Sequence, residues 1–138
     1  MFHPIQIPFG CKMLFNVVDL KDGISIEDVE LLLGEMCNVV KNNYGDDNGG
    51  FIGGQVFENA GFISAEGSVA PDTGDANKRV QQNMGDIVIV TYWKSFDQHE
   101  ASHADALFSE KFAKLAEYCD HTFEVGYNML WQGVPDEE

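Results

Sequence analysis

The chain has 138 residues, a length typical of one domain with its own hydrophobic core, and we expect a single domain spanning 1–138. Twenty-three acidic residues against eight basic ones give a net charge of −15, which repels phosphate groups and argues against nucleic-acid and membrane partners. A hydrophobic fraction of 44% excludes a disordered chain. Because the sequence has neither a signal-peptide pattern nor an apolar stretch long enough to span a bilayer, we expect a cytoplasmic protein.

The first half of the chain predicts a strand, a helix and a second strand. Apolar and β-branched residues form the first strand, and Ser25, followed by acidic residues, begins a helix with one apolar face. A turn rich in glycine, asparagine and aspartate separates this helix from the second strand. The expected bounds are Lys12 to Leu20 for the first strand, Ser25 to about Lys41 for the helix, and Phe51 to Glu58 for the second strand.

The second half predicts a loop, a strand, a helix and a last strand. Glycine and proline recur through the loop without a sustained period, and loops of that length are commonly functional. Ser95, with Gln98 three residues later, caps the second helix, whose pattern leaves room for a break. The expected bounds are 60–85 for the loop, Asp86 to Trp93 for the strand, Ser95 to about Cys119 for the helix, Thr122 to Trp131 for the last strand, and 134–138 for an acidic tail.

The element order is βαββαβ, which predicts an α+β protein of the ferredoxin-like class, with two helices on one face of an antiparallel sheet. The third strand is apolar on both faces: Ile87, Ile89 and Trp93 point one way, while Val88 and Val90 point the other. Two helices cover only one face of such a sheet. A second copy of the chain is the simplest cover for the other face, so we expect a homodimer, or a higher homo-oligomer, built as a dimeric α+β barrel.

Residues 99–103 read His-Glu-Ala-Ser-His, which places two imidazoles one helical turn apart, where both reach one divalent metal ion. The string matches the zinc-peptidase signature, with Glu100 as the general base. A peptidase needs this motif in mid-helix with a cleft around it, whereas here the expected helix begins just before His99. We therefore expect His99 and His103 to be metal ligands in another kind of enzyme, with a structural or surface role as the alternative.

A third metal ligand is expected on the last strand. Glu124 lies on the strand face opposite Phe123, Val125 and Tyr127, where a carboxylate is costly to bury without a cation. Two histidines and one carboxylate form the facial triad typical of non-haem iron(II), and the same residue types suit catalytic zinc. Asp120 is a competing third ligand, and an exposed edge-strand position is the alternative for Glu124.

The three cysteines, Cys11, Cys37 and Cys119, are odd in number and widely spaced, which favours free thiols over disulfides. Cys37 lies on the apolar face of the first helix, where a small buried side chain is the ordinary interpretation. If Cys37 lines a cavity beside a metal ion, its thiolate is expected to be favoured and nucleophilic.

These residues together resemble the amino-terminal part of sulfur oxygenase reductases. The resemblance lies in residues 13–55, with Gly34-Glu35-Met36-Cys37 and Gly50-Phe51-Ile52-Gly53, and in the segment Ile89 to His103. It implies that His99 and His103 bind a mononuclear iron, that Glu124 is the carboxylate ligand, and that Cys37 is the persulfide-carrying cysteine. Those enzymes are considerably longer, and the other cysteines of their sulfur pocket have no match here.

At the level of fold, the chain is similar to the wider superfamily of small dimeric α+β barrels that includes the antibiotic biosynthesis monooxygenases. Several of these proteins work without metal and bind an aromatic substrate or haem between sheet and helices. The sequence therefore favours an oxygenase-like enzyme with a mononuclear iron site, zinc being the alternative metal, acting on a small molecule that contains sulfur. The alternatives are a metal-free monooxygenase or small-ligand-binding barrel, whose cavity the loop 60–85 would close, and a non-catalytic dimeric module.

Overall fold

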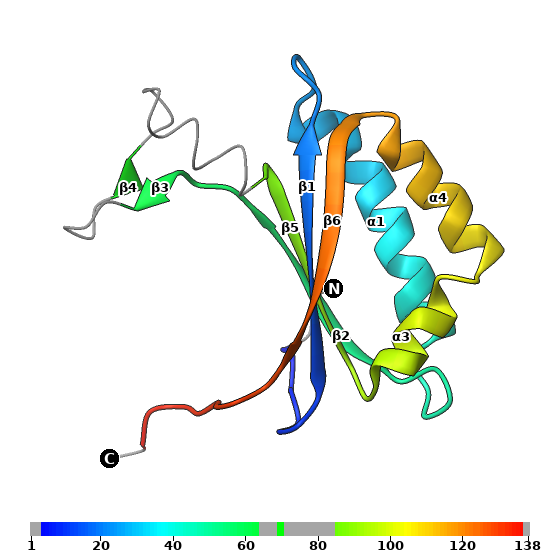
Figure 1. The fold of residues 1–138 in the computed structure, drawn as a ribbon, viewed down its shortest axis with the longest axis vertical. Coiled ribbons are helices and arrows are strands. Elements are labelled where there is room, and N and C mark those ends of the chain that lie inside the picture. The colour runs from blue at the N-terminus through cyan, green and yellow to red at the C-terminus, as the bar shows by residue number, and fades with distance from the viewer. Residues whose placement is uncertain (1–3, 64–68, 71–84, 137–138) are drawn as a thin grey trace.

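The computed structural model describes residues 4–63, 69–70 and 85–136. Four strands form an antiparallel sheet in the order β2-β5-β1-β6, and the helices α1, α3 and α4 lie on one face of it (Figure 1). This order and the chain path confirm the predicted ferredoxin-like α+β fold. The bounds are β1 Lys12–Leu20, α1 Ile26–Asn43, β2 Phe51–Glu58, β5 Ile87–Trp93, α3 Phe96–Ser102, α4 Ala106–Ala116 and β6 Cys119–Asn128.

The segment predicted as one long loop holds two further strands. β3 (Phe62–Ile63) pairs antiparallel with β4 (Val69–Ala70) in a separate two-stranded sheet. Strands of two residues are too short to produce an alternating pattern in the sequence, which is why the prediction missed them. Residues 64–68 and 71–84 lie outside the described residues. The role of this loop as a cover for the cavity therefore stays a prediction.

The second helical region is broken into α3 and α4. The side chain of Asp105 accepts a hydrogen bond from the backbone N–H of Phe108 at 2.9 Å, which caps α4 and marks the break. The last strand is shifted three residues towards the amino terminus from its predicted bounds. It begins at Cys119 because that buried side chain packs in the core, and it ends at Asn128 because its partner strand β1 begins there, at Lys12.

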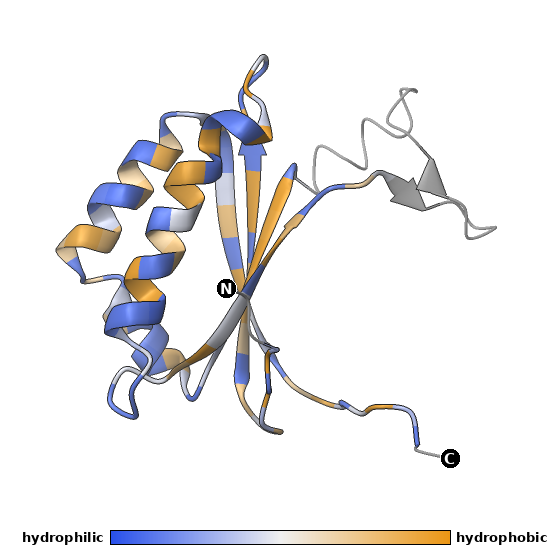
Figure 2. Ribbon diagram, turned by 180° about the vertical axis from the view of Figure 1, so that it is seen from behind, coloured by the Kyte–Doolittle hydropathy of each residue, from blue (hydrophilic) through white to orange (hydrophobic). Residues whose placement is uncertain are grey.

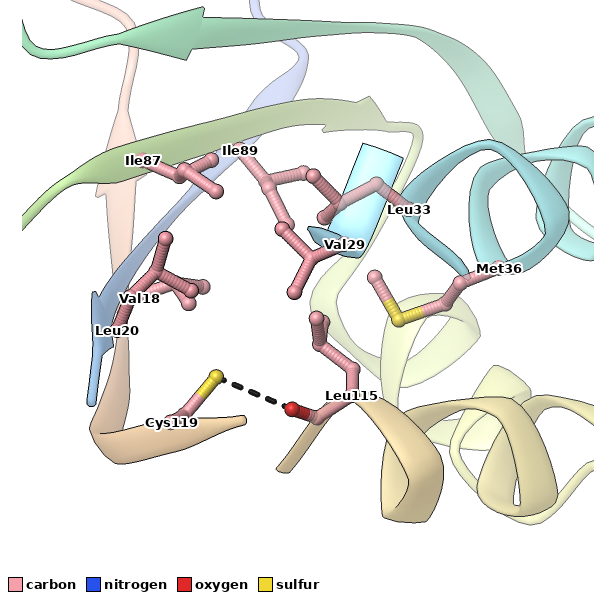
Figure 3. Close-up of a cluster of buried hydrophobic side chains, with 9 residues drawn as sticks. All are labelled: Val18, Leu20, Val29, Leu33, Met36, Ile87, Ile89, Leu115 and Cys119. Atoms are coloured by element: carbon pink, nitrogen blue, oxygen red, sulfur yellow. Dashed lines mark hydrogen bonds between the residues drawn. The ribbon is translucent and has the colours of Figure 1, made fainter. Parts of the chain in front are cut away.

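The main core lies between the sheet and the helices (Figure 3). Apolar side chains of α1 and α4 meet the helix-facing side chains of β1 and β5, and the Cys119 thiol donates to the Leu115 carbonyl at 3.2 Å. Burial of this set is the principal stabilising contribution to the fold. The cluster comprises Val18, Leu20, Val29, Leu33, Met36, Ile87, Ile89, Leu115 and Cys119.

Apolar side chains also lie on the opposite side of the sheet. No described helix lies on that side (Figure 2). We call its central part the apolar face. Four of its large side chains, Phe57, Phe123, Val125 and Tyr127, are 37% to 50% exposed. The full set given by the strand register is Met13, Phe15, Val17, Gln55, Phe57, Val88, Val90, Tyr92, Phe123, Val125 and Tyr127. Within the described ranges, none of the helices has the length and apolar character that a membrane crossing requires.

Candidate metal centre

The first histidine of the motif is held by the end of the central strand β5. Trp93, the last residue of β5, is buried, and its ring meets the ring of His99 edge to face at 5.3 Å. Ser95 then begins α3, since its hydroxyl accepts from the backbone N–H of Gln98 at 3.2 Å, as predicted. Because α3 starts so soon after β5, the side chain of His99 is held against the sheet and is only 3% exposed.

His103 is the C-cap residue of α3, one turn after His99. Its ring stacks on Phe108 of α4 at 5.5 Å, and the rings of the two histidines lie 4.4 Å apart. Asp105 lies in the break between α3 and α4. It accepts a hydrogen bond from the Tyr44 hydroxyl at 2.9 Å, which connects this break to the end of α1. The short helix therefore presents both imidazoles in one direction, as the spacing predicted.

Glu124 of β6 completes the group. Its carboxylate lies 3.2 Å from Nε2 of His99 and 3.8 Å from Nε2 of His103, and the two Nε2 atoms are 3.0 Å apart. These three residues form a group whose ligand atoms all lie within 4.8 Å of one another. Asp120 is exposed near the start of β6 and is not in this group. The geometry therefore favours Glu124 over Asp120 as the third ligand.

The donor set fits a divalent metal ion. Two atoms at about 2.1 Å from one ion lie about 3.0 Å apart at a right angle and about 3.4 Å apart at a tetrahedral angle. The 3.0 Å and 3.2 Å separations lie in this range, and the 3.8 Å separation between His103 and Glu124 is slightly longer. Two imidazole nitrogens facing each other at 3.0 Å require either a proton on one of them or a shared cation.

The other ring nitrogen of His99 is unpaired. Its Nδ1 is buried and has no hydrogen-bond partner in the described part of the chain, although a carboxylate oxygen of Glu100 lies 3.3 Å away. Metal-binding histidines commonly donate this second N–H to a carboxylate, which leaves Nε2 free to bind the ion. Glu100 lies on the Nδ1 side of the ring and not on the Nε2 side, so the position of Glu100 disfavours its role as a peptidase base at this centre.

The histidines also govern the ionisation of Glu124. Burial alone would raise the pKa of Glu124, but the hydrogen bond from His99 and the charges of His99 and His103 outweigh burial and lower the pKa. The Glu124 side chain is therefore held as a carboxylate, the form that a metal ion requires.

Two residues that the sequence analysis missed bring α3 close to β6. Gly126 lies two residues after Glu124 on the same face, and a Cβ atom there would lie 2.8 Å from the ring of Phe96. Phe96 is the first residue of α3, one turn before His99. The absence of a side chain at Gly126 therefore lets α3 approach the strand that carries Glu124. A lone glycine within an apolar strand is a sequence signal for such close approach.

The three predicted ligands and Cys37 all line one cavity of about 1160 Å³, whose lining also includes Phe57 and Phe123 of the apolar face. Most of its other lining side chains are apolar, including Met36, Ile89 and Trp93. Cys37 is half-buried, and burial raises the pKa of its thiol. Burial therefore favours the thiol form of Cys37 in the protein alone. The favoured thiolate was predicted only for a cavity that holds a metal ion, and it stays a prediction.

The sequence matches no family model and no curated protein. Solved structures with the same fold include a protein of Nitrosomonas europaea named provisionally as an antibiotic biosynthesis monooxygenase (TM-score 0.61, 9% identity, covering 92% of this chain and 97% of that one). Another is SnoaB of Streptomyces nogalater, a cofactor-independent oxygenase (TM-score 0.59, 9% identity, covering 92% and 99%). A third is a dimeric ferredoxin-like protein of unknown function from Thermobifida fusca (TM-score 0.55, 12% identity, covering 92% and 100%). At these identities the likeness shows the fold alone, which is the ferredoxin-like fold expected from the sequence.

Proposed function

We propose that the protein is an oxygenase-type enzyme that binds a small molecule in the cavity and holds one iron(II) ion with His99, His103 and Glu124. The observation that carries the proposal is the convergence of two Nε2 atoms and one carboxylate on the wall of an apolar cavity. A facial set of two histidines and one carboxylate leaves several positions of a metal ion open, as oxygenases with non-haem iron require. Zinc is the alternative metal, since it accepts the same ligand types.

Each part of the site has a task in this proposal. Glu124 supplies the negative charge that offsets the cation, while Trp93 and Phe108 hold the two imidazole rings in place. The apolar lining excludes water and binds the hydrophobic part of a substrate. A bound iron(II) ion would supply the redox chemistry by which oxygen reacts with that substrate.

Sulfur is the proposed reactive element of the substrate. This part rests on the resemblance to sulfur oxygenase reductases and on Cys37, which lines the same cavity as the three ligands. Because burial raises the pKa of the Cys37 thiol, the thiol form predominates until a substrate or a metal ion stabilises the thiolate. The Cys37→Ala variant is expected to keep its metal but to lose oxygen uptake with a sulfur substrate. If uptake survives this change, Cys37 is only a core residue.

A metal-free oxygenase is the second candidate, and the likeness to a cofactor-independent oxygenase favours it. In that case His99, His103 and Glu124 would form a proton-transfer group beside the substrate. The distances from His99 to His103 and to Glu124 allow proton transfer between them.

Metal content distinguishes the two candidates. The protein should be purified without added metal, supplied anaerobically with iron(II), freed of excess ion on a desalting column, and analysed by elemental analysis. Close to one iron ion per chain is expected, and none in a His99→Ala/His103→Ala variant. A wild-type protein that retains no metal and still consumes oxygen with a substrate would establish the metal-free candidate instead.

A homodimer is the proposed assembly. The Thermobifida fusca protein of the same fold is described as dimeric. In this chain, the exposed aromatic and branched side chains of the apolar face would be covered by the same face of a second copy. Light scattering at micromolar concentration is expected to give twice the mass of the chain, and a stable monomer would overturn the assembly.

A further inference from the structure

The segment that follows β6 exposes three large apolar side chains. We call residues 129–136 the C-terminal arm, an extended segment without helix or strand. Leu130, Trp131 and Val134 in this arm are 91%, 80% and 88% exposed. Single exposed apolar residues are ordinary, but three large ones within five residues are a feature typical of interaction sites.

The arm runs away from the helices. In both ribbon views it leaves the end of β6 on the side of the sheet that lacks helices (Figures 1 and 2). It contacts its own chain through Gln132, whose side chain donates to the carbonyl of Ile7 at 2.7 Å. This hydrogen bond fixes the arm in its extended course but leaves the apolar side chains of Leu130 and Trp131 uncovered.

The apolar face and the arm are continuous. Phe123, Val125 and Tyr127 of β6 belong to the apolar face, and the arm begins two residues after Tyr127. Although 22% of the residues in the chain are charged, the apolar face holds none, and the ion pair of Asp19 with His121 lies at its end. Covering this surface therefore buries no unpaired charge, which suits a permanent interface.

We propose that the arm of each copy packs on a second copy of this chain, so that two exchanged arms flank the contact between the two apolar faces. This inference rests on the proposed homodimer and assigns the arm as its second interface element. A second copy is the occupant that the observations favour, because twofold packing brings one arm and one apolar face from each copy to the same interface. An oppositely charged partner is disfavoured, since the apolar face to be covered holds no charged residue.

Paired serine substitutions test the arm. The Leu130→Ser/Trp131→Ser variant is expected to raise the dimer dissociation constant by at least about 30-fold in sedimentation equilibrium, because two large apolar side chains lose their contact. The matched control is Leu31→Ser. Leu31 is also an exposed apolar residue, at 74%, but it lies on helix α1, on the other side of the sheet from the apolar face. The control is expected to dimerise like the wild type. An arm variant that dimerises as tightly as the wild type would overturn the proposal.

A variant of the apolar face separates failure of the arm from failure of the dimer. Val125→Glu places a charge in the middle of the face and is expected to abolish dimerisation while the arm stays intact. If the wild type is a monomer, both the arm and the dimer are excluded. If Val125→Glu dissociates and the arm variant does not, the dimer stands and only the arm is excluded.

Direct observation of the arm uses the two tryptophans of the chain. Protein labelled with 5-fluorotryptophan gives one fluorine resonance for buried Trp93 and one for Trp131, and the Trp131→Phe variant assigns them. On dilution through the dimer dissociation constant, the Trp131 resonance is expected to move to its solvent-exposed position and the Trp93 resonance to stay in place. A Trp131 resonance that is already solvent-exposed in the dimer would contradict packing of the arm on the second copy.

Discussion

The two faces of the sheet are built from the same strands and have opposite chemistry. On β6, Glu124 points to the helices, where it meets two histidines, whereas its neighbours Phe123 and Val125 point to the apolar face. The alternation of a β-strand makes a step of one residue sufficient to exchange the proposed ligand for a residue of the proposed interface. The comparison teaches that a partly covered carboxylate is accommodated on the helix side because two imidazole rings lie beside it, while the apolar face carries no charged side chain.

The largest expected effect is the loss of metal from the helix-covered face. His99→Ala or His103→Ala removes one of three protein ligands and is expected to lower iron(II) affinity by more than about 100-fold, since even the loss of an outer hydrogen-bond partner costs about 10- to 100-fold. Elemental analysis and titration with cobalt(II), followed by absorbance, measure this loss. His121→Ala is the matched control, because His121 is paired with Asp19 and lies outside the group. Equal metal retention in the His99→Ala, His103→Ala and His121→Ala variants would contradict the proposed metal centre.

The carboxylates Glu124 and Asp120 are expected to differ sharply. Glu124→Ala removes a ligand and the charge that offsets the cation, so affinity is expected to fall by about 100-fold, while Asp120→Ala leaves it within about threefold. The same cobalt titration compares them. If Asp120→Ala lowers the metal affinity and Glu124→Ala does not, Asp120 is the third ligand. The start of β6 would then have to be arranged differently.

On the other face, one charge is expected to break the assembly and leave the metal in place. Phe123→Glu forces a carboxylate into the interface at a cost of about 3 kcal/mol, which raises the dimer dissociation constant by about 100-fold. Sedimentation equilibrium measures it, and elemental analysis of the same sample checks that the opposite face is intact. Leu107→Glu, an exposed apolar position on α4, is the control that is expected to stay dimeric. Loss of metal together with loss of the dimer would show that the two faces are not independent.

Much of the fold was predictable because the helices and long strands carry strong periodic signals. Three predicted features follow local rules, and the structure confirms them: the apolar side of helix α1, the capping of α3 by Ser95, and the apolar residues on both sides of β5. The bounds of β6 were not predictable in the same way. They depend on where β1 begins and on the packing of Cys119 in the core, which are contacts between residues far apart in the sequence.

The candidate site was predictable in its residue types and less so in its surroundings. The spacing of His99 and His103 gave their shared direction, and strand alternation gave the inward side of Glu124. No local pattern gives the distance between α3 and β6, which depends on Gly126 and Phe96, or the raised pKa of Cys37, which depends on burial by its neighbours.

Acid is expected to weaken the metal-free protein through Glu124. Because the pKa of Glu124 is lowered in the folded protein, its carboxylate stabilises the fold above about pH 4.3, the ordinary pKa of glutamate, and this stability is lost as the pH falls through the lowered pKa. Urea denaturation with a chelator present should show wild type more stable than Glu124→Gln at pH 6, and the difference should shrink towards pH 3. A difference that does not change with pH would mean that the histidines do not influence the carboxyl group.

The smallest expected effect comes from Gly126, which acts on the distance between the elements that hold the ligands. In Gly126→Ala the new Cβ would lie 2.8 Å from the outer edge of the Phe96 ring, so the ring must move and α3 must shift with it. Because His99 follows Phe96 by one helical turn, its Nε2 moves away from Glu124, and metal affinity is expected to fall by about 3- to 10-fold without loss of the fold. Cobalt titration measures the affinity and circular dichroism checks the fold. The Phe96→Leu substitution in the same chain provides room for the new methyl group and is expected to restore part of the affinity. An unchanged affinity in Gly126→Ala would mean that Phe96 yields by ring rotation alone and that α3 is positioned by Trp93 and the Ser95 cap instead.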